Sequence, residues 1–112
     1  MQDRFKFRFW DKETQTMQKC PMVELRHRIT LDEIFADDRV IFMQSTGLKD
    51  KNGTLIYEGD IVNYSCLPGY SDIYACTFNN GSFLIGGLLI SNTHLKSAVI
   101  GNIYESPELL EV

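Results

Sequence analysis

The chain has 112 residues, of which 44% are hydrophobic and 23% are charged, and its net charge is −4. This composition is typical of a globular protein and excludes a chain that stays disordered, while the length predicts one domain over residues 1–112. The net charge has the wrong sign for a protein that coats nucleic acid. The longest mostly apolar run, Phe83 to Ile90, is far shorter than the roughly 20 residues that span a bilayer, and the first residues lack the apolar run of a signal peptide. We therefore expect a cytoplasmic protein with no membrane segment.

The N-terminal third predicts two strands and one short helix. Residues 4–10 alternate strictly between two kinds of side chain, which is typical of a half-buried strand. One face carries Phe5, Phe7 and Phe9, and the other carries Arg4, Lys6, Arg8 and Trp10. Residues Met17–Leu25 favour a second strand with a break at Pro21, because proline cannot donate to a central ladder. Thr30 and Glu33 fit a capping box, so we predict a helix at about Leu31–Ala36.

The remaining residues predict short strands separated by tight turns. An Asn-Gly turn at 52–53 joins two of these strands, and Gly59 marks a corner or bulge. The predicted strands are Val40–Thr46, Leu55–Tyr57, Ile61–Cys66, Asp72–Phe78, Ser82–Ile90 with a break at Gly86-Gly87, and Ala98–Tyr104. One helical turn is expected at Pro107–Leu110. The fold class is therefore mainly β, on the border of all-β and α+β: a small β pseudobarrel of short antiparallel strands, capped by one short α-helix.

Cysteine and histidine residues are scattered along the chain. Cys20, Cys66 and Cys76 have no metal-site spacing, and His27 and His94 lie far apart. Two hypotheses stay open for the thiols: they are reduced and partly buried, or Cys66 and Cys76 form a redox pair on neighbouring strands of one hairpin.

The carboxylates give no clearer sign of a site. Asp11, Glu58, Asp60 and Glu105 have a spacing that matches no metal-ligand loop. Scattered acids are usually solvated, and the aspartates at the turns are suited to accept backbone amide protons. We therefore predict a protein that is not an enzyme, with no catalytic residues, no metal and no cofactor.

Positive charge is concentrated near the N-terminus, where residues 1–30 carry seven Lys or Arg against four Asp or Glu. A stripe of cations beside an indole could grip phosphates and stack a base. The candidate nucleic-acid contacts are Arg4, Lys6, Arg8, Trp10, Arg26 and Arg28. Two other readings stay open, since basic residues also protect exposed edge strands from aggregation, and Trp10 can pack into the core at the strand end.

Residues Ile73–Leu95 contain no Asp, Glu, Lys or Arg. So small a domain cannot easily bury both faces of these strands, and exposed apolar patches mark interfaces. We therefore predict a homo-oligomer, with the alternative that these strands form an ordinary core. The candidate interface residues are Phe83, Leu84, Ile85, Leu88, Leu89 and Ile90.

Three blocks of sequence, Phe7–Met17, Met43–Val62 and Val99–Leu110, resemble the YopX family of bacteriophage and prophage proteins. The resemblance implies a phage or prophage origin, a mainly β pseudobarrel with a capping helix, and self-association. It implies no activity and carries over no catalytic residue. Our hypothesis is a noncatalytic accessory protein that acts by self-association and by binding a host or phage protein. The alternative is a nucleic-acid-binding accessory protein that uses the basic N-terminal strand.

Overall fold

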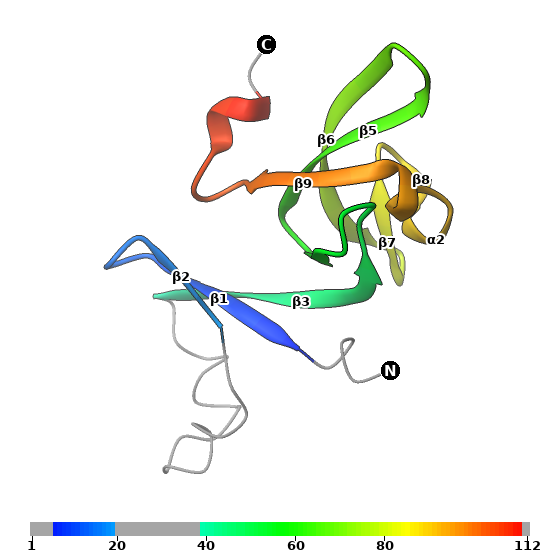
Figure 1. Cartoon of the computed structure of the whole chain (residues 1–112). Coiled ribbons are helices and arrows are strands. Elements are labelled where there is room, and N and C mark those ends of the chain that lie inside the picture. The colour runs from blue at the N-terminus through cyan, green and yellow to red at the C-terminus, as the bar shows by residue number, and fades with distance from the viewer. Residues whose placement is uncertain (1–5, 20–38, 111–112) are drawn as a thin grey trace.

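A computed structural model of the chain describes residues 6–19 and 39–110. They form two antiparallel sheets, with strand orders β2-β1-β3-β4 and β8-β7-β6-β5-β9, which curl into a half-barrel (Figure 1). The strands are β1 (Phe7–Asp11), β2 (Thr16–Lys19), β3 (Val40–Lys49), β4 (Leu55–Tyr57), β5 (Asp60–Leu67), β6 (Tyr70–Asn79), β7 (Ser82–Ile85), β8 (Leu88–Leu89) and β9 (Ser97–Asn102). The predicted mainly β fold is confirmed.

The helices of the described residues are short. They are α2 (Ile90–Thr93) and the 3-10 helices η3 (His94–Lys96) and η4 (Pro107–Leu110). The helical turn predicted at Pro107–Leu110 is confirmed as η4, whereas the helix predicted at Leu31–Ala36 lies outside the described residues. None of the described helices is long and apolar enough to cross a membrane.

Several strand bounds differ from the prediction: β3, β5 and β6 are longer than expected, and two other strands end earlier. The break at Gly86-Gly87 is confirmed and separates β7 from β8, but Ile90 begins α2 instead of ending a strand. β9 ends at Asn102, earlier than predicted, because the Asn102 side chain accepts backbone hydrogen bonds from Tyr104 and Glu105, at 3.1 and 2.8 Å. These bonds turn the chain away from the sheet.

The alternation predicted for β1 is present, but its basic face points to the interior. Arg8 lies opposite Met43, which is 2% exposed, and directly opposed residues share one face of a sheet. Arg8 and Trp10 therefore face the inside of the half-barrel. Phe9 lies opposite Phe42 on the other face, with ring centroids 5.7 Å apart. The prediction of an exposed basic strand face is wrong for Arg8, because its guanidinium forms an ion pair with a buried carboxylate on β5.

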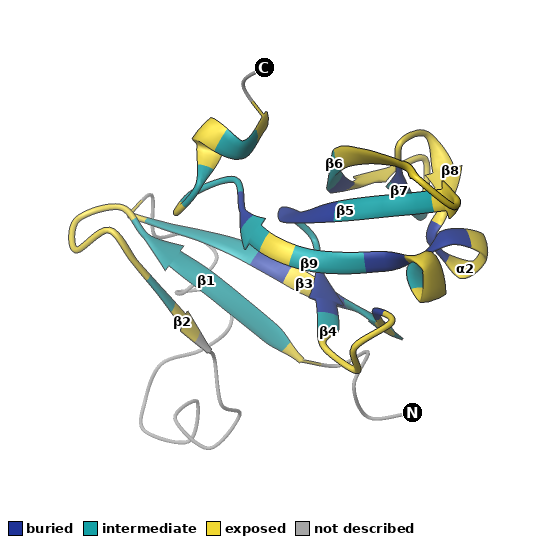
Figure 2. Cartoon of the chain, turned by 45° about the horizontal axis from the view of Figure 1, so that its top comes forward, coloured by how far each residue is buried: buried dark blue, intermediate teal, exposed yellow. Residues whose placement is uncertain are grey.

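The core combines residues of β4, β5, β6, β7 and α2, and Figure 2 shows buried stretches on β4 and β5. Its buried members are Ile56, Val62, Cys76, Ile85 and Ile90, and the half-buried side chains packed against them are Leu48, Tyr64, Tyr74, Phe83 and Val99. Ile85 and Ile90 were predicted to lie in an interface between copies, and this is wrong, since their side chains are 0% and 7% exposed. The uncharged segment therefore supplies part of the core.

Gly59 forms the corner between β4 and β5 and has a φ of +88°. Its N–H donates to the Cys76 carbonyl and its carbonyl accepts from the Ile103 N–H, each at 2.9 Å. A Cβ at this position would lie 3.1 Å from the Met43 sulfur. We expect Gly59→Ala to lower the free energy of unfolding by about 2 kcal/mol, measured by urea unfolding.

A matched control separates backbone strain from crowding at Gly59. Gly53 has a similar φ of +84°, but a Cβ there would meet no atom within 4 Å. Gly53→Ala is therefore expected to lower the free energy of unfolding through backbone strain alone, by about 1 kcal/mol. Equal losses in the two variants would contradict the close packing of Gly59 against Met43.

Candidate functional site

A cavity of about 300 Å³ lies between the two sheets. It is bounded by β3, by the corner between β4 and β5, by β6 and by the segment that follows β9. The lining residues are Ile41, Phe42, Met43, Glu58, Gly59, Ala75, Cys76, Thr77, Phe78, Ile103 and Tyr104. We refer to it as the inter-sheet groove. Its volume is at the lower end of the range of ligand-binding cavities, about 300–1,000 Å³.

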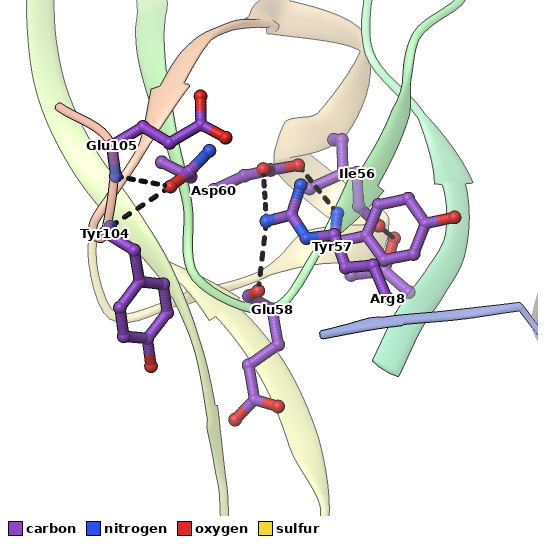
Figure 3. A network of polar contacts seen from close by, with 9 residues as sticks. Arg8, Ile56, Tyr57, Glu58, Asp60, Tyr104 and Glu105 are labelled. Carbon is purple, nitrogen blue, oxygen red and sulfur yellow. Dashed lines mark hydrogen bonds and ion pairs between the residues drawn. The ribbon is translucent and has the colours of Figure 1, made fainter. Parts of the chain in front are cut away.

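A buried ion pair lies beside the inter-sheet groove and connects β1 with β5 (Figure 3). The Arg8 guanidinium donates to Asp60 Oδ1 at 2.6 Å and to the Glu58 carbonyl at 3.4 Å. The second carboxylate oxygen of Asp60 accepts the Tyr57 N–H at 2.8 Å, and the guanidinium carbon lies 4.6 Å from the centre of the Tyr57 ring. Side-chain exposures of 12% for Arg8 and 3% for Asp60 show that the pair is shielded from water.

Burial dominates the electrostatics around this pair. It raises the pKa of Asp60 above the ordinary value, against the opposing effect of the Arg8 charge. Burial also raises the pKa of Tyr104, and the Glu58 carboxylate adds to that shift. Burial beside the inter-sheet groove thus disfavours charges that have no partner, whichever their sign.

The two described cysteines are free thiols on the neighbouring strands β5 and β6. Cys76 adjoins the Ile61–Ala75 pair and Cys66 adjoins the Leu67–Tyr70 pair, at opposite ends of the hairpin. The redox-pair hypothesis is therefore wrong. Burial, with the charges of Asp60 and Glu58, raises the pKa of Cys76 to about 12, so its thiol stays protonated at neutral pH.

The predicted basic stripe does not form one exposed surface in the described residues. Arg8 is engaged with Asp60, and the Trp10 ring stacks on Tyr104 with centroids 5.6 Å apart. Trp10 is thus half-buried against Tyr104, and neither ring belongs to the core, so the alternative of Trp10 packed into the core is not confirmed. Lys6 is exposed, and Arg4, Arg26 and Arg28 lie outside the described residues.

The predicted interface residues divide between the two faces of the five-stranded sheet. Thr77 pairs with Leu84, and Leu84 pairs with Leu89, so these three share one face. Cys76, Ile85 and Leu88 form the neighbouring row on the opposite face, where the core lies. Leu88 and Leu89 are 51% and 49% exposed, and Phe83 and Leu84 are half-buried.

Three of the described aspartates, Asp11, Asp50 and Asp60, bind backbone amides. Asp50 accepts three backbone N–H groups and Asp60 accepts one in addition to Arg8. Asp11 accepts the N–H groups of Glu13 and Thr14 at its turn. Within residues 6–19 and 39–110, no three His, Cys, Asp or Glu side chains are grouped so that they could hold a metal ion. The inter-sheet groove is the feature that sequence reasoning missed, since its walls come from four separate segments.

Comparisons with known proteins agree with this architecture. The crystal structure of protein EF1440 from Enterococcus faecalis is similar to 95% of this chain and 97% of its own, with 27% identity and a TM-score of 0.67. The crystal structure of protein YopX from Bacillus subtilis shares the fold over 96% of this chain and 99% of its own, with 19% identity and a TM-score of 0.55. A search of the curated proteins finds no match. The family model described as "YopX protein" matches residues 6–111, and the chain therefore belongs to the YopX family.

Proposed function

We propose that this chain is a noncatalytic accessory protein that self-associates and acts by binding another protein. The carrying observation is the outer face of β6, β7 and β8, on which Ile73, Leu84 and Leu89 lie. Ile73 and Leu89 are 41% and 49% exposed, within a segment that contains no charged side chain. Exposed apolar surface of this kind is typical of an interface between proteins.

A noncatalytic role is supported by the chemistry of the groups that could react. The Cys76 thiol is held protonated, and the buried carboxylates of Asp50 and Asp60 already serve backbone amides and Arg8. These groups stabilise the fold through bonds that a reaction would have to break. We further propose, from the family resemblance, that the protein belongs to a phage or prophage and works in the cytoplasm of its bacterial host.

The test of self-association is the solution mass of the Leu89→Asp variant. Leu89 is exposed on the outer face, so a carboxylate there would be buried without a partner in the assembly. We expect light scattering to show an oligomer for the unchanged protein and at least a tenfold weaker association for the variant.

Leu95→Asp is the matched control for this experiment. Leu95 is 69% exposed and lies in η3, which is not one of the three strands of the outer face. Its substitution adds the same charge and is expected to leave the mass unchanged. A monomer at all concentrations for the unchanged protein, or equal dissociation by both variants, would contradict an interface at this face.

A further inference from the structure

Strand edges, and not strand faces, form the walls of the inter-sheet groove. Successive side chains of a strand point to opposite faces, so a cavity above one face is lined by every second residue. Here the consecutive residues Ile41–Met43 of β3 and Ala75–Phe78 of β6 line the same cavity. The backbone of both strands therefore borders the groove.

The pairing of β6 with β5 stops before Phe78. The ladder ends at the pair of Ile61 and Ala75. Beyond it, the last backbone hydrogen bond on this side of β6 runs from the Gly59 N–H to the Cys76 carbonyl. The carbonyl of Cys76 thus points away from β7. Since backbone groups two residues apart on a strand point to the same side, the N–H and C=O of Phe78 point to that side as well.

The turn between β6 and β7 independently indicates that the N–H and C=O of Phe78 point away from β7. Asn80 and Gly81 have φ angles of +52° and +81°, as in a two-residue type I′ turn closed by Asn79 and Ser82. The closing pair is hydrogen-bonded, and alternation then makes Thr77 a bonded residue and Phe78 a non-bonded residue of the β6–β7 ladder. Among the described residues, nothing bonds to the Phe78 N–H or C=O on the groove side.

This edge lacks the usual protection. Proteins guard exposed edges with lysine, proline or bulges, whereas Thr77, Phe78 and Asn79 carry no charge and contain no proline. A strand edge beside an apolar groove is the arrangement with which proteins capture an extended peptide as an added strand.

Glu58 indicates which charge a peptide bound in the inter-sheet groove should carry. It carries the only charged side chain of the lining, and within the described part of the chain no hydrogen bond or ion pair engages its carboxylate. Figure 3 shows this carboxylate pointing away from Arg8, on the side of the Tyr104 ring. A Lys or Arg side chain would complement it, while Phe78, Ile103 and Tyr104 provide apolar surface in the same groove.

We propose that the inter-sheet groove binds an extended segment of a partner protein, which pairs with the Phe78 edge of β6 and places a Lys or Arg against Glu58 between apolar neighbours. This inference rests on the proposed function as a binding protein and specifies the chemistry of the bound segment. In the free protein, the Phe78 amide should exchange its hydrogen at least tenfold faster than the Thr77 amide, which bonds to β7.

The experiment is a selection of random eight-residue peptides displayed on phage against the immobilised full chain. We expect selected peptides to contain Lys or Arg between apolar residues, and to protect the Phe78 amide from hydrogen exchange. Affinity for a selected synthetic peptide, measured by fluorescence anisotropy, should fall about tenfold in Glu58→Gln, which keeps the size of the side chain but removes its charge.

A pair of variants at Phe78 isolates the backbone donor. Phe78→Ala and Phe78→Pro both lose the ring that packs on Phe83, at a centroid distance of 4.8 Å, but only proline removes the N–H. We expect the two variants to be similarly stable, because this N–H has no ladder partner, and the proline variant to bind the peptide about tenfold more weakly.

Failure of the selection, absence of Lys and Arg among selected peptides, or equal peptide affinity of the two Phe78 variants would overturn the proposal. None of these outcomes involves the outer face, so dissociation by Leu89→Asp would still support self-association. Conversely, a protein that stays monomeric but captures basic peptides at Phe78 would contradict the proposed interface and support the groove.

Discussion

Replacing Arg8 with methionine is expected to lower the free energy of unfolding by about 3–5 kcal/mol at neutral pH. The substitution keeps much of the apolar stem but leaves the Asp60 carboxylate, 3% exposed, with only the Tyr57 N–H as a partner. A buried charge without its counter-ion is far more costly than the loss of an exposed ion pair. Urea unfolding of the two proteins at pH 7 gives the measurement.

The loss in Arg8→Met should depend on pH. Burial already raises the pKa of Asp60, and removal of the opposing Arg8 charge raises it further. A carboxyl group whose pKa is higher in the folded than in the unfolded state favours folding when protonated, and this stabilisation is lost as pH rises through the folded pKa. The variant should therefore be closest to the unchanged protein near pH 4 and furthest from it above neutral pH.

A double variant provides the control for this pair. Arg8→Met combined with Asp60→Asn removes both charges but retains a carbonyl oxygen for the Tyr57 N–H. It should be more stable than Arg8→Met alone at pH 7, with a weaker dependence on pH. An unchanged loss between pH 4 and pH 8 in the single variant would show that Asp60 does not carry the effect.

Asp50→Ala is the second substitution with a large expected effect, a loss of about 3 kcal/mol or more in the free energy of unfolding. Asp50 is 3% exposed, and its Oδ1 accepts the N–H groups of Asn52 and Thr54 at 2.9 and 2.8 Å. Its Oδ2 accepts the N–H of Val99 at 2.8 Å, which fastens the turn after β3 to the edge of β9. Alanine would leave all three donors without this acceptor, as urea unfolding would show.

Asp50→Asn separates the turn from the contact between sheets. The asparagine oxygen can still accept from Asn52 and Thr54, but its NH₂ group would face the Val99 donor. We expect an intermediate loss of stability and faster hydrogen exchange at Val99, with the Thr54 amide still protected. Unchanged protection of Val99 in both variants would contradict the role of Asp50 in joining the sheets.

The sequence predicts the strands well wherever the residues that form a turn are neighbours in the sequence. Asn-Gly pairs and the glycines at 59 and 86–87 mark strand ends through the φ angles that they permit, and the structure has its corners there. Local rules fail at Asn102, whose side chain ends β9 early by capping the next turn.

Which face of β1 is buried could not be predicted, because the answer depends on a residue far along the chain. Alternation shows that Arg8 and Phe9 occupy opposite faces, but not that Asp60 lies within reach of Arg8. The groove was missed for the same reason: its walls meet only after the two sheets curl together. Ile85 and Ile90 were assigned to an interface although they lie in the core, because nothing in the local sequence distinguishes an apolar side chain of the core from one of an interface.

The two-residue turn at Asn80-Gly81 has a consequence for how relatives of this protein can diverge. The bond from the Gly59 N–H to the Cys76 carbonyl holds β6 in place, so an insertion or deletion of one residue in the turn would shift β7 against it. A shift by one residue turns every side chain of a strand to the opposite face, so Leu84 and Ile85 would exchange the outer face and the core. The length of this turn therefore decides which apolar side chains of β7 are buried, and a change in it would have to be accompanied by a changed sequence in β7.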